Sequence, residues 1–186
     1  GSQMLVSQGG TLIAQGTAAQ PIVFTSSAPT PQPGDWGYIY VGANSAARLA
    51  HCEISYGGRQ DWWAQLYIQD TNDVSVENCR IRDGATDGIR LYQTVEVLRR
   101  ILRNVTIENN AINAIHTSHV RAQPVYDNVV LRNNGADGVA LGWGNNDTLN
   151  THLTFDSKGI NGAPFIFNGL SISAGRSEEH TSREEC

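Results

Sequence analysis

A repeat of 24 to 27 residues constrains the fold of this chain more than any other feature of its sequence. With Ile107 as the reference, the same position in the other repeats is again apolar, at Ile54, Ile81, Leu131 and Phe155. Two residues earlier in each repeat stand Cys52, Cys79, Val105, Val129 and Leu153. Side chains two residues apart lie on the same side of a strand. Each repeat is therefore predicted to contribute a strand that turns both of these positions towards a core.

A polar residue precedes this pair of apolar positions in every repeat. The series is His51, Asn78, Asn104, Asn128 and His152. In stacked coils, amide side chains at one position can bond to each other along the stack, as they do in cross-β ladders. We expect Asn104 and Asn128 to stack side by side at a sharp bend between two strands, and His51 and His152 to cap that ladder.

A second series of strands with period-two alternation is predicted in each repeat. Its members are residues 36–41, 64–68, 88–91, 114–117 and 138–141. The predicted inward positions are Ile39, Leu66, Ile89, Ile115 and Val139, followed two residues later by Val41, Ile68, Leu91, Thr117 and Leu141. The first coil is expected to use residues 12–13 and 21–24 as strands, with Ile22 and Phe24 inward. Three prolines place residues 27–35 in an exposed loop.

Two repeat architectures have a period of this length. The spacing Leu102-x-x-Val105-x-Ile107-x-x-Asn110 also resembles the signature of a leucine-rich repeat. A leucine-rich repeat usually places helical or similarly compact structure opposite its strand. Here the opposite segments, 88–92 and 138–141, begin with glycine and alternate with period two, which predicts strands.

Taken together, these features resemble the right-handed parallel β-helix superfamily of pectate-lyase-like proteins, over about residues 5 to 175. The resemblance implies an all-β fold, a right-handed parallel β-helix of about six coils, in a single domain from residue 4 to residue 175. It also implies a fragment of a bacterial protein that is secreted or displayed at the cell surface.

Both ends of the chain carry residues that we do not expect to belong to this fold. Residues 1–3 resemble a cloning remnant. Residues 176–186 begin with Arg-Ser-Glu-Glu-His-Thr-Ser, which resembles a translated sequencing adapter. We therefore expect a non-native, disordered tail, read from an incomplete assembly of environmental DNA. Self-association is expected through the exposed end of the solenoid, near Pro164 to Ile172.

The composition of the chain argues against two kinds of partner, nucleic acids and membranes. The formal net charge is −5 and the chain has a single lysine, Lys158, which argues against a nucleic-acid partner. The sequence contains no run of 18 apolar residues, so no membrane span is predicted.

Cys52 and Cys79 share one inward position on neighbouring coils. In-register parallel strands meet disulfide geometry poorly, so we expect two stacked thiols. The outward residues of this first strand series are expected to form a charged ladder on a solvated face: Ser55, Arg82, Glu108, Arg132 and Asp156.

The outward positions of the second strand series suggest a ligand. They are Tyr40, Tyr67, Arg90, His116 and Ala140. Aromatic rings pack against the apolar faces of sugars, and arginine can clamp a carboxylate with two bonds. In the superfamily a strand face of this kind commonly carries a polysaccharide groove. The predicted binding residues are Tyr40, Tyr67, Trp143, Trp62 and Trp63, and the predicted partner is a polysaccharide or oligosaccharide, acidic if Arg90 acts as a clamp. The alternative is that tyrosines are simply favourable strand residues.

Catalysis has weaker support. Lyases of the superfamily use a base, a cationic residue and often calcium, and His116, Arg90 and Tyr92 could form such a group. No lyase or hydrolase motif of the superfamily is present. Asp87 and Asp137 fit turn positions better than a pair of catalytic acids. The pair His116-x-x-His119 lacks a third ligand, so no metal site is predicted, and no cofactor is expected apart from the calcium that a lyase would use.

Two classes of function therefore stay open. The first is a carbohydrate-associated β-helix, derived from a polysaccharide lyase or a glycoside hydrolase or binding glycans without turnover. The second is a noncatalytic structural or adhesin-type solenoid.

Overall fold

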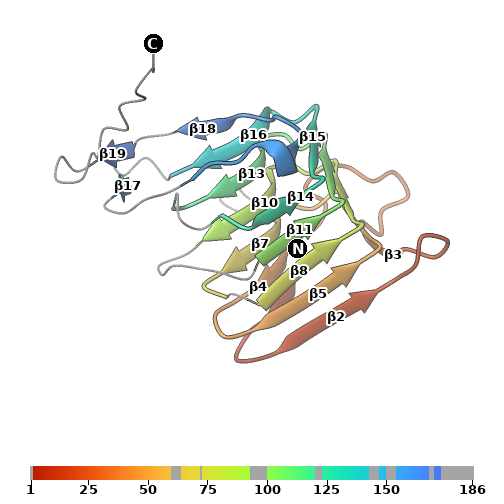
Figure 1. The fold of residues 1–186 in the computed structure, drawn as a ribbon. Helices are drawn as coiled ribbons and strands as arrows, with labels where there is room; N and C mark the ends of the chain where they lie inside the picture. Colours follow the sequence, from red (N-terminus) through yellow and green to blue (C-terminus); the bar gives the residue numbers. More distant parts are fainter. Residues whose placement is uncertain are drawn as a thin grey trace, which may run out of the picture.

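The computed structural model describes residues 2–59, 64–71, 73–92, 100–119, 123–142, 147–149, 154–167 and 170–172. It is a parallel β-solenoid, in which the strands of successive coils stack into three sheets around one core (Figure 1). Within the described ranges, helix is limited to a short 3-10 turn, η1, at Lys158–Ile160. Two of the sheets contain five strands, so the solenoid has about five turns and not the six that the sequence predicted.

Sheet A has seven parallel strands. They are β1 (Met4–Val6), β4 (Ile39–Val41), β7 (Ala64–Gln69), β10 (Asp87–Tyr92), β13 (Asn113–Thr117), β16 (Ala136–Leu141) and β18 (Phe165–Phe167). Its five central strands, β4 to β16, are the predicted second strand series, with boundaries shifted by at most three residues.

Sheets B and C have five strands each. Sheet B contains β2 (Thr11–Gln15), β5 (Ala46–Ala50), β8 (Asp73–Glu77), β11 (Arg100–Arg103) and β14 (Val125–Asp127). Sheet C, the predicted first series, contains β3 (Ile22–Phe24), β6 (Cys52–Ser55), β9 (Arg80–Arg82), β12 (Thr106–Glu108) and β15 (Val130–Arg132). A separate two-stranded sheet pairs β17 (Asp147–Leu149) with β19 (Leu170–Ile172).

Sheet B was not predicted as a third series. Its inward positions include the small Ala47 and even the charged Arg100, which pairs with Val74, so the apolar alternation is weak. From β5 to β15, its strands are also separated from those of sheet C by only one or two residues, so the two strands look like one segment in the sequence.

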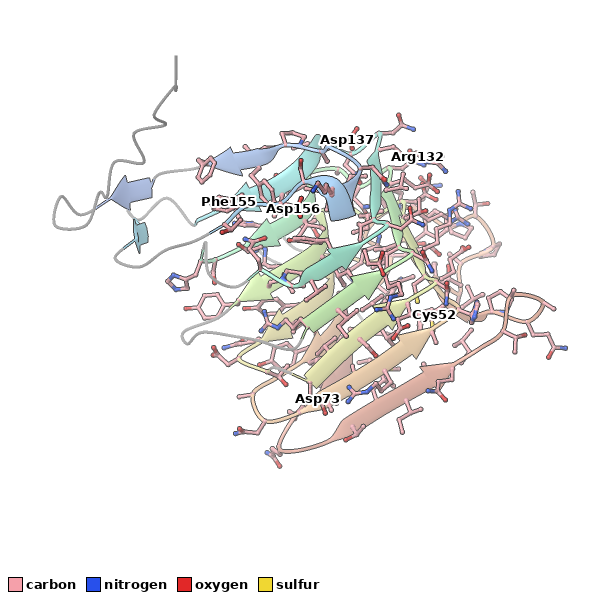
Figure 2. The ribbon with its side chains drawn as sticks, in the orientation of Figure 1. Cys52, Asp73, Arg132, Asp137, Phe155 and Asp156 are labelled. Carbon is pink, nitrogen blue, oxygen red and sulfur yellow. The ribbon has the colours of Figure 1, made fainter. Side chains whose placement is uncertain are left out.

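The predicted inward positions form the core. The fully buried large side chains include Ile54, Ile81, Ile107, Ile39, Leu66, Ile89 and Ile115. Leu131 and Phe155 occupy the same position near the C-terminal end and are partly buried against this core. Figure 2 labels Phe155 near β18, where its ring centroid lies 4.9 Å from that of Phe165. Because like residues lie over like residues, each buried aliphatic side chain contributes roughly 1.5 to 3 kcal/mol.

The asparagine ladder is confirmed. His51, Asn78, Asn104 and Asn128 all have left-handed backbone conformations, with φ between 50° and 54°, at the bend between sheets B and C. Asn104 Nδ2 donates to Asn78 Oδ1 over 3.0 Å, and Asn128 Nδ2 donates to Asn104 Oδ1 over 2.9 Å. Asparagine tolerates this conformation better than most residues, so it serves both the bend and the ladder. His152, the predicted cap at the other end, lies outside the described residues.

A second amide ladder, not predicted, lies buried at the corner between sheets C and A. Gln65 Nε2 donates to Asn110 Oδ1 over 2.7 Å, and Asn110 Nδ2 donates to Asn134 Oδ1 over 2.8 Å. Gly84 faces this ladder, and a Cβ there would lie only 2.6 Å from Gln65 Nε2. Asp137, the second residue of β16, ends the ladder and accepts hydrogen bonds from the backbone amides of Asn133 and Asn134 in the preceding turn.

The cysteine prediction is confirmed. Cys52 and Cys79 are buried free thiols, and the Cys52 amide donates to Cys79 Sγ over 3.3 Å. Burial raises the pKa of Cys79 to about 12, so the thiol behaves as a small apolar group.

The charged ladder on sheet C is partly wrong as predicted. Ser55 is buried, and Glu108 is enclosed, with its side chain 4% exposed, between Arg80 and Arg132. Arg132 Nε donates to Glu108 Oε2 over 2.6 Å, whereas Arg82 bonds Glu53, with Nη2 2.8 Å from Oε1. Two long arginine stems shield the shorter glutamate from water, so the face is not uniformly solvated.

Candidate functional site

The predicted outward row of sheet A lies in register along the solenoid. Tyr40 pairs with Tyr67, Tyr67 with Arg90, Arg90 with His116, and His116 with Ala140. Four polar or aromatic side chains from four coils therefore form one continuous row. The row is more enclosed than a simple solvent face, because Tyr67 and Arg90 are buried and Tyr40 and His116 are half-buried.

An aromatic pair forms the N-terminal part of the row. The ring centroids of Tyr40 and Tyr67 are 5.5 Å apart, and the Tyr40 hydroxyl donates to Gln69 Oε1 over 3.1 Å. The Tyr40 ring extends over Gly42, where a Cβ would lie 2.7 Å from the ring carbon Cε1, so glycine is required beneath it. Burial raises the pKa of Tyr67 to about 12. Tyr67 is only 7% exposed and Tyr40 is half-buried, so Tyr40 is the accessible member of the pair.

Asp87 organises the other part of the row. It is fully buried at the start of β10, and its Oδ2 accepts Arg90 Nε at 2.9 Å and Nη2 at 2.6 Å. Its Oδ1 accepts the amide of Asn113 at 3.1 Å and the Nδ2 of Asn113 at 2.8 Å. Asp87 was predicted to be a turn residue. That prediction is wrong, because Asp87 is the first residue of β10 and its carboxylate accepts hydrogen bonds from residues of two coils.

His116 joins the same network through both ring nitrogens. Its Nδ1 lies 3.3 Å from Asp87 Oδ2 and 3.3 Å from Arg90 Nη2, and its Nε2 lies 3.1 Å from the Gly142 carbonyl oxygen. A carbonyl only accepts, so Nε2 must carry the proton. In the neutral ring Nδ1 then accepts from Arg90, and in the charged ring it donates to Asp87.

The charge state of Asp87 follows from these neighbours. Burial alone would raise its pKa, but the hydrogen bond with His116 and the charges of Arg90 and His116 outweigh burial and lower the pKa. Asp87 is therefore an anion at neutral pH, and it offsets the charge of Arg90 directly.

The predicted catalytic residues come from adjacent strands. Arg90 and His116 are brought together, and Tyr92 lies on the same face of β10, half-buried and paired with Gln69 of the neighbouring coil. Their catalytic role stays a prediction. The predicted binding residues Trp62, Trp63 and Trp143 lie outside the described residues.

A groove on the outer face of sheet B was not predicted. It has a volume of about 600 Å³, and its lining includes Arg48, Asp73, Ser75, Glu77, Ile101 and Val125. Ser75 is the short side chain between Arg48 and Ile101 in one outward row, which leaves the space. The signal in the sequence was this small residue between larger neighbours, but it required sheet B to be recognised first.

In the part of the chain that the structure describes, no cluster of three or more His, Cys, Asp or Glu side chains could hold a metal ion. Across the same residues, no helix is long and apolar enough to cross a membrane.

The fold and its stacked outward rows define a parallel β-solenoid with about five turns. Within that class, the chain belongs to the right-handed β-helix family, whose model, described as a right handed beta helix region, matches residues 36–157. A second family model, described as a pectate-lyase like beta helix domain, matches residues 2–65. No curated protein and no solved structure matches the chain.

Proposed function

We propose that this chain is a secreted, carbohydrate-associated β-helix that binds a glycan along the outer face of sheet A. The observation that carries the proposal is the aromatic pair of Tyr40 and Tyr67 in one axial row, with Tyr40 partly exposed. An aromatic ring offers a flat apolar surface to the face of a sugar. The half-buried Gln69 and Tyr92 lie beside it on adjacent coils and can meet sugar hydroxyls.

Repetition supports a polymeric ligand. The row continues from coil to coil at roughly the 4.8 Å spacing of neighbouring strands, so a chain of repeating units can lie along the solenoid axis. The similarity to pectate-lyase-like domains points to the same class of ligand.

Binding without turnover fits the geometry of His116 better than catalysis. A general base must accept a proton from its substrate. Here Nε2 donates to the Gly142 carbonyl and Nδ1 faces Asp87 and Arg90, so neither nitrogen can act until a bond is broken. Lyase activity is the alternative that product detection tests.

One observation favours the alternative of a purely structural or adhesin-type solenoid. Tyr67 and Arg90 are buried, and Asp87 bonds Arg90, His116 and Asn113. A row that satisfies its own polar groups needs no ligand to be stable.

Affinity electrophoresis of the full chain against immobilised neutral and acidic polysaccharides tests the proposal. Tyr40→Ala should abolish retardation, because it removes the exposed ring. Tyr56→Ala is the matched control, since Tyr56 is a half-buried tyrosine on another part of the solenoid, near Arg82. Ultraviolet absorbance of unsaturated uronates in the same samples would reveal lyase turnover. Absence of both binding and cleavage across the panel would leave the structural alternative.

A further inference from the structure

The ligand class of the sheet A row follows from the pairing of its one arginine. This inference rests on the proposed function: we infer that this surface prefers neutral glycans to glycans that carry uronate carboxylates, because Arg90 is buried and Asp87 already occupies one edge of its guanidinium. The sequence alone suggested the opposite preference, with Arg90 as a carboxylate clamp.

One edge of the Arg90 guanidinium is already bound to a carboxylate of the protein itself, that of Asp87. Two-bond recognition of a carboxylate needs two parallel N–H groups of one guanidinium. The Nε and Nη2 groups of Arg90 both point at Asp87 Oδ2, at 2.9 and 2.6 Å. The Arg90 side chain is only 7% exposed and that of Asp87 is fully enclosed, so water does not loosen this pair. A ligand carboxylate would have to displace a carboxylate that is part of the fold.

Displacement would be costly. Removing one partner from a buried ion pair leaves an uncompensated buried charge. Asn113, on the neighbouring coil, also donates two hydrogen bonds to Asp87, and these bonds hold the Asp87 carboxylate in place. Sugar hydroxyls avoid this competition because they need only a donor or an acceptor.

The other described charges near the aromatic pair do not attract an anion. Burial raises the pKa of both Tyr40 and Tyr67, and the negative charge of Asp70 raises both further, so an acidic group acts on this pair. Asp70 also interacts electrostatically with the buried Arg100. The two acids, Asp87 and Asp70, balance the two arginines, Arg90 and Arg100.

A matched pair of probes separates charge from shape. An oligogalacturonate and its fully methyl-esterified form share one skeleton and differ in charge. Isothermal titration of the full chain should show that the ester binds about tenfold more tightly than the free acid at low salt, where attraction between charges is least screened. This comparison needs no variant, so it holds even if a substitution in the row fails to fold.

Asp87→Asn then tests the cause. It keeps the shape and removes the carboxylate that pairs with Arg90, so binding of the free acid should improve by about tenfold and weaken again in salt, and the preference for the ester should be lost. Glu77→Gln, on sheet B, is the control for loss of one negative charge elsewhere and should not alter the preference.

The outcomes are distinguishable. Tighter binding of the free acid by the unaltered chain overturns the inferred preference but leaves glycan binding on sheet A intact. Failure of both probes, together with failure of the whole polysaccharide panel, counts against the proposed function itself.

Discussion

The Asp87–Arg90 pair on sheet A and the Arg48–Asp73 pair on sheet B join the same residue types, yet they lie in opposite environments. The first is buried, with its side chains 0% and 7% exposed, and the second is open, at 62% for Asp73 and 39% for Arg48. Both arginines stand at outward positions of strands. Burial by the surrounding coils, and not residue type, decides what each pair does.

The comparison teaches where the charges of this solenoid are structural. A buried pair contributes little in sum but becomes costly when one partner is lost, whereas an exposed pair is worth about 0 to 1 kcal/mol. Sheet A therefore holds its polar row in one arrangement, while the charges over the sheet B groove are free to rearrange.

A carboxylate with no partner sets the upper limit of this contrast. Ile107→Asp places one in the fully buried core position of β12 and should unfold the protein, because the cost of several kcal/mol is comparable with a total stability of roughly 5 to 15 kcal/mol. Circular dichroism during heating would show no cooperative transition. Ile107→Val, which should cost only about 0.5 to 1.5 kcal/mol, is the control. A parent-like melt of the aspartate variant would mean that the side chain does not face the core.

Removing one partner from each pair tests the comparison directly. Asp87→Ala should lower the free energy of unfolding by roughly 3 to 5 kcal/mol, because the buried Arg90 loses its ion-pair partner. Asp73→Ala should lower it by less than about 1 kcal/mol. Urea titration of both variants measures the difference. Equal losses would show that burial does not separate the two sheets.

The loss of stability at low pH should come next in size, and it should depend on the enclosed carboxylates of Asp87 and Glu108. Burial alone would raise the pKa of Glu108, but hydrogen bonds from Arg132 and Arg80 outweigh it and lower the pKa, as the neighbours of Asp87 lower the pKa of that residue. Both acids hold protons more weakly in the folded state, so their stabilisation is present above the unfolded pKa values of about 4 and is lost as pH falls through the lower folded values. Unfolding free energies between pH 6 and pH 2 should fall steeply for the parent and less steeply for Asp87→Asn.

The smallest effect should come from the exposed asparagine ladder. Asn104→Gly keeps the left-handed bend easily and removes the amide bonds to Asn78 and Asn128, at a cost of about 1 kcal/mol. Asn104→Ala should cost roughly 1 kcal/mol more, since it adds strain at φ 50°. Thermal melts of the two variants separate the bond from the bend. Identical melts would show that the backbone conformation carries no penalty.

The sequence was sufficient for features that repeat in every coil. Ile54, Ile81 and Ile107 predict the core, because stacking places equivalent residues of successive coils over one another. Asn104 predicts the bend for the same reason. The family and the register of the row from Tyr40 to His116 follow from this regularity.

Features that depend on how coils enclose outward side chains were missed. Aspartate is a common turn residue, so the sequence predicted a turn at Asp87. Only the folded chain shows that Arg90, Asn113 and His116 all bond to it. Glu108 was placed in solvent because its position is outward, but arginines on both neighbouring strands cover it. Such burial arises from side chains of different coils and leaves no periodic signal.

The short bend between sheets B and C has a consequence for how a gene for such a chain can change. From β5 to β15 it is only one or two residues long in each coil, while the connections from sheet C to sheet A and from sheet A to sheet B vary. A single inserted codon at the bend would reverse the inward and outward faces of the next strand. The other two corners already differ in length from coil to coil, so the stack accommodates changes of length there. Duplication of one whole coil, bend included, adds a rung in phase, so a solenoid of this kind can lengthen by copying while its bend stays fixed.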